Sequence, residues 1–329
     1  MNKYFYIFLT GILAVTFSSC NEVDYSTKEL YKPVVYLLSK ETYNVYSQPY
    51  PFNDGNEVTG YLSIGCGGTL SNPEAFTVEL EPDTVLLKEF NTGNFDIDSS
   101  KYAMILPQDR YQIESYSVNY PAENTDQYVK MAIKVNPDGL SPDSTYFIPL
   151  SIKSVSNYEA NPDKSNVLFR IELQNYYAGS YYAGSPSNET NYQGSGSILA
   201  ADSTPVSPIR VTALVRALSK NSVRVYVGAN SQTNKSTLDE IKKFSMKLTV
   251  DENDSVAIAP YDSTQIQVEA VKNVDGWNIY EEVRKDAVTT NTDKYFNLYY
   301  RYRTVKTQGN PPVYDDWIMV QETLKRLEN

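Results

Sequence analysis

Residues 128–152 read YVKMAIKVNPDGLSPDSTYFIPLSI, and this stretch decides the fold class. Apolar side chains take every second position in 129–135 and again in 146–152. An alternation with period two predicts β-strands, each with one buried face and one face in water. The segment 136–143 between them is rich in Asn, Pro, Asp, Gly and Ser, the residues that form turns. Pro149 lies inside the second run, so this run is predicted to be an edge strand or to carry a bulge.

Short apolar runs of the same kind continue on both sides of this stretch. Further runs are found at 34–38, 58–64, 76–80 and 167–173. About seven short strands separated by turns, without a strong helix signal, are typical of an immunoglobulin-like β-sandwich. Residues 31–175 are therefore predicted to form this sandwich, and the polar residues 21–30 are predicted to be a tether.

A tandem repeat marks the start of a second domain. YYAGS occurs at 176–180 and again at 181–185. We therefore place the domain boundary near Asn175 and assign residues 176–329 to the second domain. Period-two alternation returns in this half, at 209–217, 223–227 and 295–303. One short helix is predicted from Ser236, which can cap it. These features predict an all-β protein whose C-terminal domain is an antiparallel β-barrel or sandwich with one short helix.

The N-terminus has the layout of an export signal. Lys3 supplies a positive charge, residues 4–17 are mainly apolar, and small residues precede Cys20. The apolar run of about 14 residues is shorter than the roughly 20 that a membrane-spanning helix needs. We therefore predict that residues 1–20 are a lipoprotein signal peptide and that Cys20 is lipidated, which attaches the protein stably to a membrane. The alternatives are a transmembrane anchor and a plain secreted protein.

The composition excludes several classes of function. The chain of 329 residues contains no histidine, which excludes Ser-His-Asp and Cys-His catalysis, imidazole bases and the common zinc sites. Its net charge of −11 repels phosphate backbones and argues against nucleic acid as a partner. With Cys20 lipidated, Cys66 is left alone, so no intrachain disulfide is predicted. No cofactor and no metal site are predicted.

Aromatic residues provide the best candidates for ligand contact. The chain has 29 tyrosines and 2 tryptophans. The flat faces of sugars pack on aromatic rings, while sugar hydroxyls seek charged and amide groups. The predicted ligand-binding residues are Trp277, Tyr299, Arg301, Tyr314 and Trp317. The alternative is that both tryptophans belong to the core and that outward tyrosines only pack across strands.

Clusters of carboxylates are the other candidates for chemistry, at 251–254, 281–282 and 315–316. In a chain without histidine, paired carboxylates are the apparatus that can hydrolyse a glycoside. Acidic pairs in the turns of an acidic protein are usually solvated, however. Residues 251–254 also lack the glycine and the distal glutamate of a calcium-binding loop. The sequence therefore predicts a protein that is not an enzyme.

Two stretches resemble a known family. Residues 140–152, and residues 106–111 together with the run 129–135, are similar to the N-terminal domain of Bacteroides-type surface lipoproteins. In some relatives this domain of unknown function precedes an endo-β-N-acetylglucosaminidase. The second half resembles the β-rich C-terminal domain of other relatives, with its YAGSY start at 177–181 and the run at 295–303. The resemblance implies glycan binding at the cell surface beside starch-utilisation-type transporters. It does not imply catalysis, because the sequence lacks the motif Asp-x-x-Asp-x-Asp-x-Glu of the glycosidases.

These features together predict a non-catalytic glycan-binding lipoprotein of a polysaccharide-utilisation system. The expected partners are an oligo- or polysaccharide, an outer-membrane glycan transporter pair and the membrane, through the lipid anchor. The expected location is the outer membrane, facing the cell exterior, because residues 21–24 resemble the acidic export signal of Bacteroides-type lipoproteins. The alternatives are an accessory subunit of the transporter complex without its own sugar site, and a carboxylate-dependent glycosidase. Since Cys20 leads directly into the N-terminal domain, the ligand site is expected in the distal residues 176–329.

Overall fold

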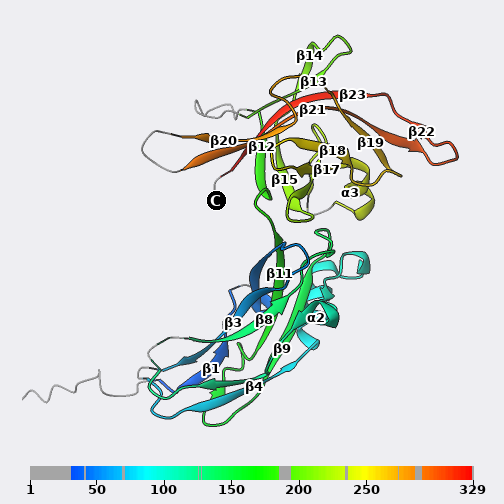
Figure 1. The fold of residues 1–329 in the computed structure, drawn as a ribbon. Helices are drawn as coiled ribbons and strands as arrows, with labels where there is room; N and C mark the ends of the chain where they lie inside the picture. The colour runs from blue at the N-terminus through cyan, green and yellow to red at the C-terminus, as the bar shows by residue number, and fades with distance from the viewer. Residues whose placement is uncertain are drawn as a thin grey trace, which may run out of the picture.

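Two β-rich domains follow one another along the chain (Figure 1). The structure is a computed structural model, and it describes residues 31–40, 42–68, 71–124, 126, 128–184, 194–233, 236–272, 274–285 and 291–327. The predicted signal peptide, Cys20 and the tether 21–30 lie outside the described residues. Within the described ranges, none of the helices is both long and apolar enough to cross a membrane.

The N-terminal domain is a sandwich of two sheets in which most neighbouring strands are antiparallel. In spatial order, the strands of the first sheet are β10 (Glu159–Ala160), β1 (Val34–Leu37), β3 (Val58–Gly67), β8 (Tyr128–Val135) and β6 (Tyr111–Gln112). Those of the second sheet are β2 (Val45–Pro51), β11 (Asn166–Gln174), β9 (Tyr146–Val155), β4 (Phe76–Pro82) and β7 (Ser117–Tyr120), with β5 (Met104–Ile105) beside β9. Three 3-10 turns lie between strands, η2 (Thr42–Asn44), η3 (Ser99–Lys101) and η4 (Gln108–Arg110). The apolar faces of both sheets meet in one core, as expected for a sandwich.

An α-helix that the sequence pattern did not predict covers the outside of the second sheet. Phe90 of helix α2 (Val85–Phe95) packs on Phe147 of β9, with ring centroids 5.1 Å apart. Asn91 of the same helix exchanges two hydrogen bonds with the backbone of Ala103, at 2.8 and 2.9 Å. The helix sequence, VLLKEFNTGNF, contains a glycine and two asparagines and has no regular apolar stripe. Packing against the sheet therefore stabilises this helix more than its own propensity does.

Pro149 lies in a central strand of the second sheet, so the predicted edge position is wrong, but β9 does carry a bulge, at residues 152–154 in its pairing with β4. Strand β9 pairs with β11 on one side, and on the other it pairs with β5 through residues 146–147 and with β4 from Leu150 onward. The carbonyl oxygen of Pro149 accepts a hydrogen bond from the backbone N–H of Asp83 at 3.1 Å. In a strand, the N and the C=O of one residue point to the same neighbour. The missing N–H of Pro149 therefore falls where the neighbour changes from β5 to β4, and no ladder bond is lost.

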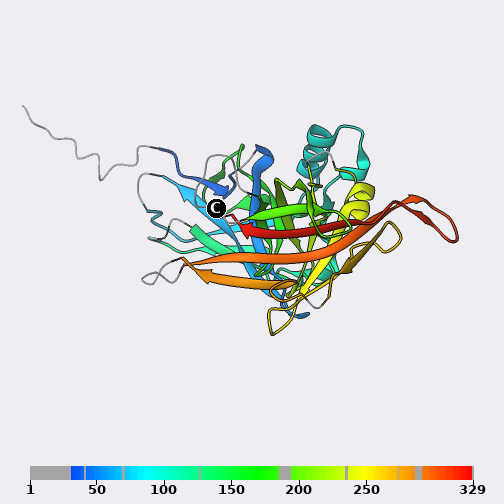
Figure 2. The same ribbon diagram turned by 90° about the horizontal axis from the view of Figure 1, so that it is seen from above.

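The C-terminal domain is a curled antiparallel sheet (Figures 1 and 2). Its strands are β12 (Gly179–Ala183), β13 (Ser195–Leu199), β14 (Pro205–Pro208), β15 (Val211–Ala217), β16 (Ser222–Tyr226), β17 (Ser245–Val250), β18 (Val256–Pro260), β19 (Ile266–Ala270), β20 (Ile279–Arg284), β21 (Thr292–Thr307), β22 (Val313–Tyr314) and β23 (Ile318–Arg326). Figure 2 shows β21 and β23 side by side along the length of the domain. From β23 the sheet continues through β12, β15, β16 and β17 to β18. A bridge between Ser255 and Ile279 brings this end back to β20, so the sheet forms a barrel around one core and the all-β prediction is confirmed.

The short helix predicted in this domain is present, but it begins one residue later than expected. Helix α3 (Leu238–Phe244) is capped by Thr237 rather than by Ser236. The Thr237 side chain accepts from the backbone N–H of Glu240 at 3.2 Å, and the Glu240 carboxylate accepts from the backbone N–H of Thr237 at 2.9 Å. This reciprocal pair is a capping box. The Ser236 hydroxyl accepts instead from the backbone N–H of Thr233.

A hydrogen-bonded connection joins the two domains. The side chain of Asn175, between β11 and β12, donates to the carbonyl oxygens of Ser219 and Ser222 at 2.6 and 2.8 Å. Its amide oxygen accepts from the backbone N–H groups of Tyr177 and Ala178 at 3.1 and 2.8 Å. These four bonds fix the connecting residue to the C-terminal domain and restrict how far the two domains can turn against each other.

Candidate functional site

The predicted ligand-binding residues lie on or beside the outer face of strand β21. Tyr299 and Arg301 alternate along this strand with Leu298 and Tyr300, which point into the barrel core. Trp277 belongs to the loop before β20, Tyr314 to β22, and Trp317 to the residues just before β23. The hairpin that contains β22 projects sideways from the barrel (Figure 2). Segments that are distant in the sequence therefore meet over one face of the sheet.

Two arginines and two aromatic rings on this face form a stack, which we call the arginine–aromatic cluster. It consists of Arg301, Arg303, Tyr314 and Trp317. The guanidinium carbon of Arg301 lies 4.4 Å from the ring centroid of Trp317. That of Arg303 lies 4.5 Å from the Trp317 ring and 4.5 Å from the Tyr314 ring. Arg303 was not among the predicted residues, although its place two positions after Arg301 on the same face is visible in the sequence.

Two side chains from β19 hold the guanidinium groups in place. Arg301 donates from Nε and Nη2 to one oxygen of Glu269, at 2.9 and 2.5 Å. Arg303 donates from Nε to the amide oxygen of Gln267 at 2.8 Å. In the part of the chain that the structure describes, Nη1 of Arg301 and both Nη atoms of Arg303 have no hydrogen-bond acceptor. The cluster therefore combines fixed aromatic rings with donors that are available to a ligand.

Trp277 and Tyr299 form a more enclosed pair beside the cluster. Their ring centroids are 6.2 Å apart, in an edge-to-face arrangement. Tyr299 is only 7% exposed, and its hydroxyl lies 3.2 Å from the Ser203 hydroxyl and donates to the sulfur of Met319 at 3.4 Å. Both Trp277 and Trp317 are half-buried, so neither tryptophan is sealed in the core. Tyr299 thus packs against Trp277 and does not offer an open ring face.

The carboxylates that were weighed as catalytic candidates have local structural partners. Glu281 and Glu282 are neighbours in β20, so their side chains point to opposite faces of the sheet. The Glu281 carboxylate accepts from Asn297, and the Glu282 carboxylate accepts from the Tyr176 hydroxyl. Asp251 accepts from two backbone N–H groups of the turn that follows it. Across the described ranges, no group of three or more His, Cys, Asp or Glu side chains is placed to hold a metal ion.

A buried ion pair connects the two domains. Nη2 of Arg224 on β16 lies 2.7 Å from Oδ1 of Asp143, and the two side chains are 0% and 2% exposed. The other Asp143 oxygen accepts from the Tyr261 hydroxyl at 2.7 Å, and Arg224 also donates to Gln232 at 2.9 Å. Burial and the bond to Asp143 raise the pKa of Tyr261 to about 12, so its hydroxyl remains a donor at neutral pH.

The position of Arg224 corrects one expectation from the alternating pattern. Arg224 alternates with valines in 223–227, which predicted that it faces water. All five residues of β16 are buried, because a second layer covers the face that was expected to be wet. That layer includes Asp143 of the N-terminal domain. An alternating pattern shows which residues share a face, but not whether another domain covers that face.

The barrel also contains a buried carboxyl, that of Glu322 on β23. The Tyr300 hydroxyl donates to this carboxyl at 2.7 Å and accepts from the backbone N–H of Gly228 at 2.7 Å. Burial raises the pKa of Glu322 to about 7, and the hydrogen bond from Tyr300 opposes that rise. The Glu322 carboxyl therefore changes its protonation near neutral pH.

Two family models match this chain. A model of an N-terminal domain matches residues 27–159, and a model of a C-terminal domain matches residues 165–325. The second match includes β11, which pairs with β2 and β9 in the N-terminal domain. None of the curated proteins that were compared matches the chain.

Solved structures from Bacteroides species share the whole fold. A Bacteroides ovatus protein of unknown function is 16% identical, with a TM-score of 0.63 over 89% of this chain and 94% of its own. A multidomain protein from the same species is 15% identical, with a TM-score of 0.61 over 88% and 93%. An auxiliary nutrient-binding protein from Bacteroides thetaiotaomicron is 17% identical, with a TM-score of 0.61 over 88% and 92%. As the resemblances in residues 106–152 and in residues 177–181 and 295–303 implied, the chain consists of the N-terminal and the C-terminal domains that the two family models describe, in the arrangement of these Bacteroides proteins.

Proposed function

We propose that this protein binds glycans at the cell surface without cleaving them, and that the arginine–aromatic cluster is its sugar site. One observation carries the proposal. Two aromatic rings, those of Tyr314 and Trp317, are stacked on two guanidinium groups on the outer face of a barrel. Rings that are held in one orientation by a scaffold lose little conformational entropy when a flat ligand packs on them.

The chemistry of the cluster fits the two surfaces of a sugar. The C–H faces of a pyranose ring are apolar and pack on aromatic rings, of which Trp317 provides the larger. The hydroxyl groups are both donors and acceptors of hydrogen bonds. The unpaired N–H groups of Arg301 and Arg303 supply donors, and Glu269 supplies acceptors beside them. A few oriented polar groups around an apolar platform are typical of small-molecule sites.

Catalysis is not part of the proposal. Hydrolysis of a glycoside requires two carboxyl groups that face each other across one bond. Glu281 and Glu282 point to opposite faces of β20, and Asp315 accepts a hydrogen bond from the Thr304 hydroxyl. In place of bond cleavage, the half-buried cluster on the outer face of the barrel would hold a glycan for other proteins to process or import.

The position of the chain start supports a site far from the membrane. Strand β1, near the beginning of the described chain, lies at the end of the N-terminal domain that points away from the C-terminal domain (Figure 1). A lipid anchor at Cys20 would then place the barrel farthest from the membrane. With the outer membrane as the proposed location, the cluster would reach the medium and could pass glycan to a transporter pair. The fold shared with an auxiliary nutrient-binding protein is consistent with this role.

Replacing Trp317 with alanine tests the site. We first screen the purified protein on a panel of plant, host and microbial glycans and measure the affinity for the best ligand by calorimetry. Because a central tryptophan in a binding surface commonly contributes 2 kcal/mol or more, W317A is expected to weaken binding by about 30-fold or more.

An aromatic residue of the other domain provides the matched control. Tyr61 is exposed and also lies under a cation, Lys130, with 5.8 Å between the amine and the ring centroid. Y61A is expected to leave the affinity unchanged. Equal losses in W317A and Y61A, or no loss in W317A, would reject the cluster as the site. If no glycan binds the wild-type protein, and purified membranes yield a transporter complex that contains it, the accessory-subunit alternative is correct.

A further inference from the structure

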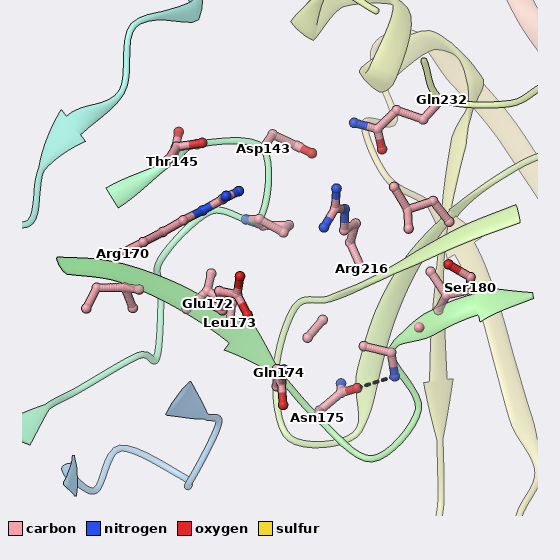
Figure 3. Close-up of a pocket in the computed structure, with 18 of the residues that line it drawn as sticks. Asp143, Thr145, Arg170, Glu172, Leu173, Gln174, Asn175, Ser180, Arg216 and Gln232 are labelled. Atoms are coloured by element: carbon pink, nitrogen blue, oxygen red, sulfur yellow. Dashed lines mark hydrogen bonds between the residues drawn. The ribbon is translucent and has the colours of Figure 1, made fainter. Parts of the chain in front are cut away.

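A cavity of about 450 Å³ lies between the two domains, away from the arginine–aromatic cluster. Its walls come from strand β11 and the loop 142–145 of the N-terminal domain, and from strands β12 and β15 of the C-terminal domain. Figure 3 shows these walls, with the connecting residue Asn175 at one edge. A volume of this size is within the range of about 300–1,000 Å³ that small-molecule sites occupy.

Three arginines line this cavity. Arg170 on β11 and Arg216 on β15 extend into the space from opposite domains (Figure 3). Within the described part of the chain, neither makes an ion pair or a side-chain hydrogen bond. Arg326 is the third, and its Nη1 donates to the carbonyl oxygen of Tyr176 at 2.9 Å. By contrast, Nη2 of the nearby Arg224 donates to both Asp143 and Gln232.

The charges around the cavity do not cancel. The Asp143 carboxylate is used by Arg224 and by the Tyr261 hydroxyl. Glu172 is the other acidic residue of the lining. Since Asp143 is neutralised by Arg224, the remaining charged groups of the lining are three guanidinium groups and the carboxylate of Glu172. These groups leave an excess of two positive charges. The whole chain has a net charge of −11, so this local excess is opposite in sign to the protein as a whole.

The environment of Arg216 shows that the excess of positive charge in the cavity is unfavourable. The Arg216 residue is partly open to solvent, but desolvation against the cavity walls lowers its pKa, and the positive charges of Arg224 and Arg170 lower it further. The carboxylates of Asp143 and Glu172 oppose this shift. An anion in the cavity would face Arg170 and Arg216 together and remove their repulsion. Guanidinium groups bind carboxylate, sulfate and phosphate oxygens through paired N–H donors, with better geometry than lysine amines.

We propose that the cavity between the domains binds the anionic group of an acidic sugar, a carboxylate or a sulfate ester, between Arg170 and Arg216. The choice of a sugar as the carrier of the anion rests on the glycan-binding function proposed above. One guanidinium group comes from each domain, so the bound anion also ties the two domains together. The cavity and the arginine–aromatic cluster are then separate sites. The cavity binds the anionic group of a sugar, and the cluster binds the apolar face of a sugar ring.

Calorimetry with matched sugars tests this proposal at constant ionic strength, since salt screens charge interactions. The probes are a galacturonate disaccharide, a sulfated disaccharide and a neutral galactose disaccharide. Because hydrogen bonds to charged groups contribute about 1.5–3 kcal/mol, at least one acidic sugar is expected to bind about 10-fold or more tightly than the neutral one. Equal affinity for acidic and neutral sugars would overturn the proposal, and the two acidic probes distinguish carboxylate from sulfate.

Substitutions of the arginines that line the cavity show where the anionic group binds. The double variant R170M/R216M is expected to lose the preference for acidic sugars, and the single variant R216Q is expected to reduce it. R210M, which removes an exposed arginine of the C-terminal domain outside the cavity, is the control and is expected to retain the preference. An acidic preference that survives in both R216Q and R170M/R216M would place the anion elsewhere and reject the proposal.

The outcomes also separate this proposal from the proposed function. If neutral sugars bind and W317A abolishes that binding, but acidic sugars have no advantage, only the anion site is rejected. If acidic sugars bind through Arg170 and Arg216 while W317A has no effect, the cavity is supported and the cluster is rejected. If none of the three disaccharides binds but another glycan of the panel does, only the anion site is rejected, and if no glycan of the panel binds, both proposals fail.

Discussion

Replacing Arg224 with alanine is expected to lower the free energy of unfolding by about 3–5 kcal/mol, the cost of breaking one buried ion pair. The variant leaves the Asp143 carboxylate in a site where its side chain is 2% exposed, with the Tyr261 hydroxyl as its remaining donor. A buried carboxylate without a counter-charge must either remain desolvated or take up a proton, and both reduce stability. Urea denaturation followed by circular dichroism measures the change.

A second ion pair between the domains provides the matched control. Lys220 and Asp54 lie 2.5 Å apart across the junction, but their side chains are 61% and 62% exposed. Exposed pairs contribute about 0–1 kcal/mol, so K220A is expected to change stability little. The double variant R224M/D143L removes both buried charges and is expected to recover most of the loss. If R224A is no more destabilising than K220A, the buried pair does not hold the domains together.

The stability of the barrel is expected to depend on the protonation of Glu322. Burial raises the pKa of this carboxyl from 4.5 to about 7 in the folded state. The folded protein therefore keeps a proton that the unfolded chain releases between these values. The contribution of Glu322 to the free energy of unfolding is fully present below about pH 4.5 and is lost as the pH rises through about 7. The interval between the two pKa values corresponds to about 3 kcal/mol.

The variant E322Q isolates this effect from the other titrating groups. Glutamine is neutral at every pH and retains an acceptor for the Tyr300 hydroxyl. The stability of the wild-type protein minus that of E322Q is expected to fall by about 3 kcal/mol between pH 4 and pH 8. Urea denaturation at a series of pH values measures this difference. Parallel stability curves for the two proteins would show that Glu322 does not titrate in this range.

Glu114 provides a control with the opposite sign. The hydrogen bond and the charge of Lys134 lower the pKa of the Glu114 carboxyl. Its contribution to stability is therefore present at neutral pH and lost as the pH falls through the folded-state pKa. The difference between the wild-type protein and E114Q is expected to change in the opposite direction to that for E322Q.

Most strands could be predicted because each has one face in a domain core. The run 129–135 alternates in the sequence and in the burial of strand β8, because only one side of that strand meets the core. Strand β9 is different, since residues 146–150 are all buried. Helix α2 covers its outer face, and the sequence of that helix has no regular apolar stripe. The helix depends on contacts with a sheet that is distant in sequence, so local pattern could not predict it.

In the candidate site, too, the positions of side chains along one strand could be predicted, but their contacts with distant parts of the chain could not. The shared face of Tyr299 and Arg301 follows from period two, and Arg303 follows from the same rule. The burial of Tyr299 depends on Ser203, in the turn between β13 and β14, and on Met319 of β23. The pairing of Arg224 with Asp143 depends on how the domains meet. No pattern within one strand contains that information.

The chain has only two tryptophans, which allows the most direct test of the sugar site. The variant W277F leaves Trp317 as the only tryptophan, and W317F leaves Trp277. Both are titrated with the best glycan while intrinsic fluorescence is recorded and calorimetry confirms saturation. The expected result is a saturable change in emission from Trp317 in W277F, and weakened binding in W317F. An unchanged Trp317 emission at a glycan concentration that saturates W277F would contradict binding at the arginine–aromatic cluster.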